Sequence, residues 1–108
     1  MVGEVGAGVG VLAVEMAATA KHVYAIEIDP AWTYAFMRHL YAAKPVNLTW
    51  IFGRAEDVAE WLRADVAIVV TRSGQTRMRE VALRMAPKVL FPLEANPKDV
   101  FTLASAVP

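Results

Sequence analysis

A glycine-rich stretch near the N-terminus reads Glu4-Val5-Gly6-Ala7-Gly8-Val9-Gly10. Residues 1–5, which overlap the start of this stretch, form a short, mostly apolar segment that is typical of a buried strand. After it, apolar side chains recur at helical spacing from Val9 to Ala20. A strand, a glycine turn and a helix in this order begin a parallel α/β unit. In such a turn, glycine permits a tight bend and a close approach of a ligand to the backbone.

The same alternation continues along the chain. Residues 22–28 are rich in β-branched and aromatic types, which favours a second strand. Asp29 and Pro30 are typical of a helix start, and Pro45 is expected to lie beyond the end of that helix. Further strands are expected at 47–52, 66–71, 88–91 and 100–107. Two more helices are expected: one at 56–64, and one that begins after a cap at Ser73 or Thr76 and ends at Ala86. The pattern predicts an α/β protein with a doubly wound, mostly parallel Rossmann-like sheet of five to six strands and helices on both faces.

The composition agrees with one well-packed domain, residues 1–108. Hydrophobic residues, counted with tyrosine and without glycine, make up 56% of the chain. The share is higher still when the 6 glycines are counted in place of the 3 tyrosines. So much apolar material excludes an intrinsically disordered chain. The absence of cysteine excludes a disulfide framework, zinc-ribbon sites and cysteine nucleophiles. His22 and His39 share no ligand spacing, so no metal site is expected.

The formal net charge of zero means that no overall field attracts nucleic acid or a membrane surface. No apolar run approaches the ~18 residues of a membrane span. No basic segment precedes an apolar stretch at the N-terminus, as it would in a signal peptide. These features predict a soluble, cytoplasmic protein.

A carboxylate, Glu27, follows the glycine turn near the end of the expected second strand. In doubly wound sheets ligands bind beyond the carboxyl ends of the strands, where an acid at this place accepts the ribose hydroxyls of an adenosine. Nicotinamide dinucleotide folds use Gly-x-Gly-x-x-Gly, which would need glycine at position 11, where this chain has Val11. The structural alternatives are that the glycines serve only close packing and that Glu27 is a solvated strand end.

The pattern Glu4-x-Gly6-x-Gly8-x-Gly10, together with the strand ending in Glu27, resembles the class I S-adenosylmethionine-dependent methyltransferase superfamily over roughly residues 1–91. The resemblance implies S-adenosylmethionine or S-adenosylhomocysteine as cofactor. Backbone around Val5 to Gly8 would hold its methionine part, and Glu27 its ribose. Ile28 would pack on adenine, the loop from Gly53 to Glu56 would form the rim, and Thr71 would lie near the sulfonium. The cofactor-binding residues implied in this way are Glu4, Val5, Gly6, Ala7, Gly8, Gly10, Glu27, Ile28, Ala55, Glu56 and Thr71.

The chain also departs from that pattern. Many members place an acid for the adenine amino group where this chain has Arg54, so Glu56 or a backbone carbonyl would have to replace it. The Asn/Asp-Pro-Pro-Tyr segment of amino-methylating relatives is absent, and residues 70–74 read Val-Thr-Arg-Ser-Gly. This segment is slightly similar to the Gly-Ser-Gly loop of precorrin methyltransferases that also decarboxylate. If this similarity holds, Arg72 and Arg77 would bind carboxylates of the substrate. The structural alternative is that both arginines lie on a solvent-exposed helix face.

The function predicted from these residues is methyl transfer from S-adenosylmethionine to an unidentified acceptor, with the catalytic residues unknown. The alternatives are a non-catalytic cofactor-binding module or subunit that needs a partner, a precorrin-type methyltransferase/decarboxylase relative, and a nicotinamide or other nucleotide binder. Full members of the superfamily carry further elements at both ends, so exposed apolar surface and a homodimer or partner subunit are expected. No motif supports nucleic-acid binding, and the larger aromatic residues are assigned to the core or an interface: Trp32, Tyr34, Phe36, Trp50 and Trp61.

Overall fold

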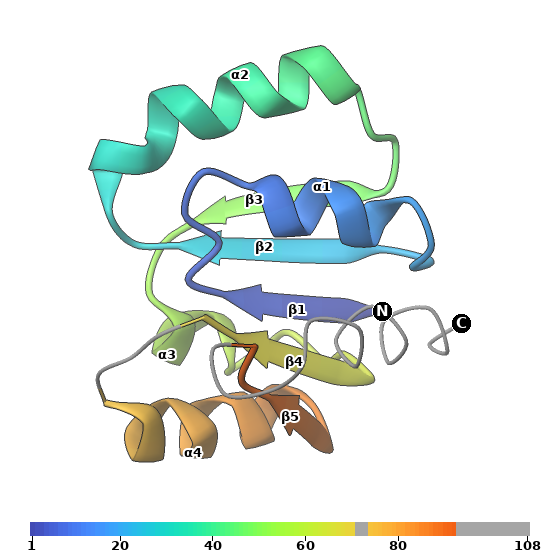
Figure 1. Ribbon diagram of the computed structural model, residues 1–108. Coiled ribbons are helices and arrows are strands. Elements are labelled where there is room, and N and C mark those ends of the chain that lie inside the picture. The colour runs from blue at the N-terminus through green and yellow to red at the C-terminus, as the bar shows by residue number, and fades with distance from the viewer. Residues whose placement is uncertain (71–73, 93–108) are drawn as a thin grey trace.

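The computed structural model describes residues 1–70 and 74–92. Its centre is a five-stranded sheet in the order β3-β2-β1-β4-β5, and every neighbouring pair is parallel. Figure 1 shows the strands with their carboxyl ends at one edge. The strands are β1 (Val2–Val5), β2 (Val23–Glu27), β3 (Leu48–Phe52), β4 (Val66–Val69) and β5 (Lys88–Leu90). This confirms the predicted doubly wound parallel sheet, while the strand expected at 100–107 lies outside the described residues.

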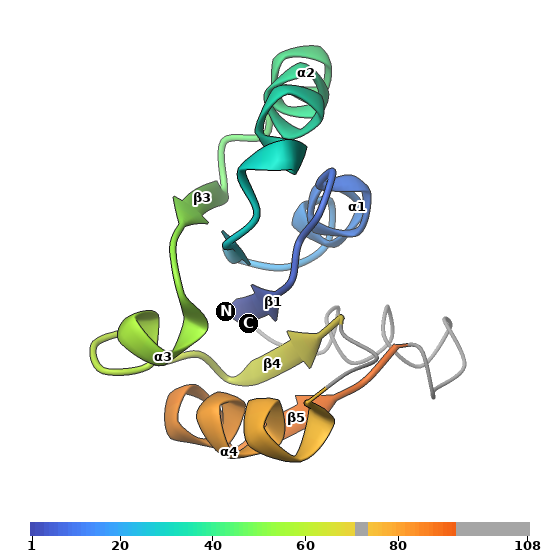
Figure 2. The same cartoon turned by 90° about the vertical axis from the view of Figure 1, so that its left-hand side faces the viewer.

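Helices cover both faces of the sheet. They are α1 (Val11–Ala17), a 3-10 turn (Pro30–Trp32), α2 (Thr33–Ala43), α3 (Ala55–Val58) and α4 (Gln75–Met85). Figure 2 shows α1 and α2 on one side of the sheet and α3 and α4 on the other. Within the described ranges, no helix is long and apolar enough to pass through a membrane.

Two apolar clusters form the core, one on each face of the sheet. Ile68 packs with α1 and with Phe36 of α2 on one face, whereas Ile26 and Val69 pack with α3 and α4 on the other. Successive side chains of a strand point to opposite faces, so both faces are buried only if the central strands are apolar throughout. The all-apolar β4 meets this condition, and all four of its side chains are buried.

Tertiary contacts end two helices earlier than the sequence pattern predicts. The helix expected at 56–64 is only α3, because the Ala64 N–H donates to the Met85 carbonyl at 2.7 Å and draws the chain toward α4. The helix expected to reach Ala20 ends at Ala17. There the Asn47 amide donates to the carbonyls of Ala17 and Ala20, at 2.7 and 2.8 Å.

The start of α4 also differs from the prediction. Its N-cap is Gly74 in the left-handed conformation, with φ of 64°. Thr76 lies inside the helix and is therefore not the cap, and Ser73 lies outside the described residues.

The apolar residues of α2 and of the turn before it are only partly buried. Phe36 is fully buried and stacks on Trp50 at 4.9 Å between ring centroids, but Trp32 and Ala43 are exposed. Trp32 belongs to the 3-10 turn, which has about 3.0 residues per turn and so changes the helical phase before α2 begins. Among the other aromatic residues assigned to core or interface, Tyr34 and Trp61 are exposed.

Candidate functional site at the carboxyl ends of the strands

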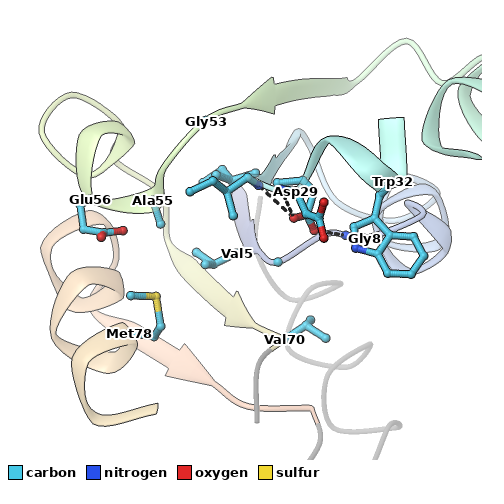
Figure 3. Close-up of a pocket in the computed structure, with 13 residues that line it drawn as sticks. Val5, Gly8, Asp29, Trp32, Gly53, Ala55, Glu56, Val70 and Met78 are labelled. Atoms are coloured by element: carbon cyan, nitrogen blue, oxygen red, sulfur yellow. Dashed lines mark hydrogen bonds between the residues drawn. The ribbon is translucent and has the colours of Figure 1, made fainter. Parts of the chain in front are cut away.

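A cavity of about 570 Å³ lies at the carboxyl ends of the strands, within the range of ~300–1,000 Å³ typical of small-molecule sites. It is lined by Val5, Gly6, Gly8, Ile26, Glu27, Ile28, Asp29, Trp32, Gly53, Ala55, Glu56, Val70 and Met78. In Figure 3, Gly8, Asp29 and Trp32 lie at one end of the cavity, and Ala55, Glu56 and Met78 at the other. The strand order reverses beside β1, so the cavity lies where doubly wound folds bind ligands.

Glu27 ends β2 and holds the loops at one end of the cavity together. Its Oε1 accepts the Gly8 N–H at 2.7 Å, and its Oε2 accepts the N–H groups of Ile28 and Asp29, both at 2.9 Å. Its side chain is fixed in place, with the residue only 7% exposed. A carboxylate offers about four acceptor positions, so one position on Oε1 is left for a ligand.

The glycine loop is shaped by close packing. Gly6 has φ of 80°, and a Cβ there would lie 2.6 Å from the Val70 carbonyl oxygen, so no other residue fits. The N–H groups of Gly6 and Ala7 both donate to the Ile26 carbonyl, at 2.9 and 3.0 Å. The loop therefore rests on the end of β2, with its backbone facing the cavity.

Glu4 lies in β1 below this loop and is fully buried. Within the described parts of the chain, neither of its carboxyl oxygens has a hydrogen-bond partner. Burial, and to a smaller extent the nearby negative charge of Glu27, raises the pKa of Glu4 to about 8. At neutral pH the Glu4 side chain is therefore mainly a neutral acid.

Glu56 supplies the charge at the other end of the cavity. Its Oε2 accepts hydrogen bonds from the guanidinium groups of Arg54 at 2.9 Å and Arg77 at 3.3 Å. The bond from Arg54 is the largest of the effects that hold the pKa of Glu56 below its usual range. A negatively charged acceptor is thus kept beside an otherwise apolar wall that includes Ala55 and Met78.

The fold agrees with what comparisons with known proteins find. No protein family model matches the sequence. Over 62 residues, or 57% of this chain, the sequence is 45% identical to the probable ribosomal RNA small subunit methyltransferase A of Pyrobaculum aerophilum. That match covers 25% of the relative.

Two solved structures each match 79% of this chain. The precorrin-6y C5,15-methyltransferase of Geobacter metallireducens has a TM-score of 0.70 at 17% identity, with 47% of its chain covered. TYW2 of M. jannaschii, in complex with AdoMet, has a TM-score of 0.71 at 24% identity, with 40% covered. The chain has the α/β Rossmann-like fold of these methyltransferases. It spans a quarter of the curated relative and under half of each of these two structures.

Within this methyltransferase fold, most residues predicted from the sequence lie around one cavity. Those that line it are Val5, Gly6, Gly8, Glu27, Ile28, Ala55 and Glu56. Three others, Glu4, Ala7 and Gly10, are buried in or under the glycine loop and are not among the lining residues. Gly10 packs against Phe36, since a Cβ there would lie 3.0 Å from the ring. Thr71 lies outside the described residues.

Three further residues line the cavity although the sequence does not predict them as cofactor-binding residues: Asp29, Trp32 and Met78. Asp29 also has its predicted role as a helix cap, because its Oδ1 accepts the Ala31 N–H at 2.9 Å. Trp32 is expected in the core or an interface, and its place shortly after the strand that ends in Glu27 is the signal in the sequence that points to the cavity. Met78 follows β4 by several residues, and only the packing of α4 brings it to the cavity.

The histidines hold separate parts of the methyltransferase fold together. His22 bonds to the Thr49 hydroxyl at 2.7 Å, between the starts of β2 and β3. His39 of α2 bonds to the Val9 carbonyl in the glycine loop. In the parts of the chain that the structure describes, no group of three or more potential ligands could hold a metal ion.

Proposed function

We propose that this chain binds S-adenosylmethionine, or its product S-adenosylhomocysteine, and forms the cofactor site of a methyltransferase. The observation that carries this proposal is Glu27, a buried carboxylate at the end of β2 that is bonded to the glycine loop and lines a cavity of about 570 Å³. The similarity to methyltransferases in sequence and in fold supports the same function.

The contacts of Glu27 define how a ribose would bind. One hydroxyl can donate to the remaining position on Oε1 without any rearrangement. A second hydroxyl would have to replace the Gly8 N–H on that oxygen. Ile28, which is 58% exposed beside the cavity, offers an apolar surface on which adenine would pack.

The methionine part would lie along the backbone from Val5 to Gly8, with Glu4, Ala7 and Gly10 supporting the loop from below. Thr71 stays a prediction for the sulfonium end. When bound, S-adenosylmethionine supplies an electrophilic methyl group on a positively charged sulfur, and the protein has to hold this group in line with a nucleophile.

Glu56 is the candidate for the adenine amino group, in place of the acid that Arg54 replaces. A carboxylate accepts an N–H well, and the two arginines keep Glu56 charged and directed along the cavity wall. This arrangement would compensate for the missing acid two positions earlier.

For the methyl acceptor we propose RNA, because the relative that is 45% identical over 62 residues is a probable ribosomal RNA methyltransferase. No catalytic residue is assigned to this chain. The precorrin-type alternative is supported by fold alone, through two precorrin enzymes at 17% and 23% identity, and its candidate Arg72 lies outside the described residues.

Isothermal titration calorimetry with S-adenosylmethionine, S-adenosylhomocysteine and NAD tests the proposal. We expect the first two to bind and NAD not to bind. Glu27→Ala should weaken binding at least tenfold, because charge-assisted hydrogen bonds to the ribose are lost. The matched control is Glu15→Ala, which removes an exposed carboxylate from α1 and should leave the affinity unchanged. NAD binding alone would support the nicotinamide alternative, and cofactor binding without methyl transfer would support the non-catalytic module.

We also propose a single domain over residues 1–108 that forms a homodimer or pairs with a partner subunit. Support comes from the outer strand β3, where the last residue, Phe52, is 55% exposed and Val46, two residues before the strand, is 99% exposed. An exposed strand edge with apolar neighbours readily pairs with another chain. Light scattering at micromolar concentration tests this, and a monomeric mass would contradict it. The cytoplasmic location stays a prediction.

A further inference from the structure

The outer face of α2 carries large side chains that are mostly exposed in the described chain. Tyr34 and Tyr41 are 74% and 78% exposed, and Met37 is 55% exposed. Tyr34 and Tyr41 are seven residues apart, about two helical turns, so they lie on the same face. The core contact of α2 comes from Phe36, so folding does not account for these exposed aromatic rings.

Positive charges accompany both tyrosines. The Arg38 guanidinium carbon lies 5.9 Å from the ring centroid of Tyr34, and Lys44 Nζ lies 5.5 Å from that of Tyr41. The sequence has no acidic residue between Asp29 and Glu56, although the whole chain has a formal net charge of zero. The face is therefore locally cationic in a protein that is neutral overall.

The two tyrosines also border a hollow of about 370 Å³, which Met37, Arg38 and Ala42 complete. Alternating rings and cations suit a single-stranded nucleic acid, since its bases stack on aromatic rings while its phosphates meet the positive charges. A second copy of this chain suits the face less well. A two-fold contact would bring Arg38 and Lys44 close to cations on the same face of the other copy.

The N-terminal end of α2 adjoins the cavity. Trp32, two residues before Tyr34, lines the cavity and is 44% exposed. From there α2 runs along the outside of the molecule toward Lys44, as Figure 1 shows. On the inner side of the same helix, His39 bonds to the glycine loop through the Val9 carbonyl.

We propose that this face of α2 binds single-stranded RNA. The surface, which we call the α2 track, consists of Trp32, Tyr34, Arg38, Tyr41 and Lys44. The choice of RNA rests on the proposed function, in which the cavity holds the methyl donor and RNA is the acceptor. A strand on the α2 track would have one end at the cavity, where a base could reach the donor.

Fluorescence anisotropy with a labelled single-stranded 12-nucleotide oligouridine tests the α2 track. We expect Tyr34→Ala/Tyr41→Ala to weaken binding at least tenfold, because two stacking surfaces are lost. Arg38→Gln/Lys44→Gln should also weaken it. This second variant should lower the slope of log affinity against log salt concentration by about 1.4, since each phosphate contact on a single strand contributes about 0.7.

The matched control is Trp61→Ala/Lys88→Gln, which removes an exposed aromatic residue and an exposed cation elsewhere on the surface. It should bind the oligonucleotide as the unaltered chain does. Three results would overturn the proposal: no binding at low salt, equal losses in the control, or a change in the mass of the tyrosine variant by light scattering, which would identify the face as a protein interface.

Calorimetry with S-adenosylmethionine on the same variants separates this proposal from the proposed function. Loss of RNA binding with normal cofactor binding supports both. A second outcome is that the chain does not bind the cofactor but binds RNA in a way that depends on the α2 track. This outcome would overturn the proposed function and still support the RNA-binding role of the α2 track.

Discussion

The buried carboxyl group of Glu4 links the stability of this protein to pH. Its pKa is about 8 in the folded chain and about 4.5 when unfolded, so between these values the folded state holds one more proton than the unfolded state. The free energy of unfolding must therefore decrease as pH rises through this window, by up to about 1.4 kcal/mol per pH unit, and level off above it. We predict that Glu4→Gln removes this decrease and makes the protein more stable than the unaltered chain at pH 8.

Urea unfolding at pH 5, 7 and 9 measures this effect. The glutamine side chain has nearly the same volume and carries no charge, so it keeps the packing in β1. Glu15→Gln on the exposed face of α1 is the control and should keep the pH dependence of the unaltered chain. Equal pH dependence in the two variants would contradict a neutral, buried Glu4.

Among the secondary-structure elements, α1 and β3 are joined by one side chain. The Asn47 amide donates to the carbonyl of Ala17, the last residue of α1, and to that of Ala20 in the turn that follows. We predict that Asn47→Ala lowers the free energy of unfolding by about 1–3 kcal/mol, because these carbonyls lose their partner. Thr49→Ala, which removes a bond to His22 at an exposed place, should cost under about 0.5 kcal/mol. Chemical unfolding of both variants provides the test, and similar costs would show that Asn47 does not connect the two elements.

The same contact shows how far sequence patterns predict these elements. Apolar spacing placed each strand and helix of the described chain within a few residues, since each element needs its own period of apolar side chains. It failed at helix ends. Nothing local indicates that Asn47 would stop α1 or that Ala64 would bond to Met85, because both contacts join residues distant in sequence.

For the whole molecule, the cavity predicts a strong coupling between ligand binding and stability. Its lining comes from the ends of β1, β2, β3 and β4 and from α4, so a ligand that fills it connects most of the sheet.

S-adenosylmethionine at 100 times its dissociation constant should stabilise the fold by about 2.7 kcal/mol. For a domain of this size we predict a rise in melting temperature of roughly 10–20 °C. Differential scanning calorimetry measures it, with Glu27→Ala at the same ligand concentration as the variant that should show a smaller rise. No rise in the unaltered chain would contradict a cofactor site in this cavity.

The amino-acid sequence alone predicts the parallel sheet, the glycine turn after its first strand and the acid that ends its second. These depend on short-range patterns: apolar alternation, the conformational freedom of glycine and a charge at a strand end. Three features become visible only in the folded chain: Glu4 is buried with no hydrogen-bond partner among the described residues, Arg54 and Arg77 hold Glu56 at the cavity, and Trp32 and Met78 complete the cavity walls. Those features arise where elements distant in the chain pack together, and burial and charge pairing are set by the neighbours that packing supplies.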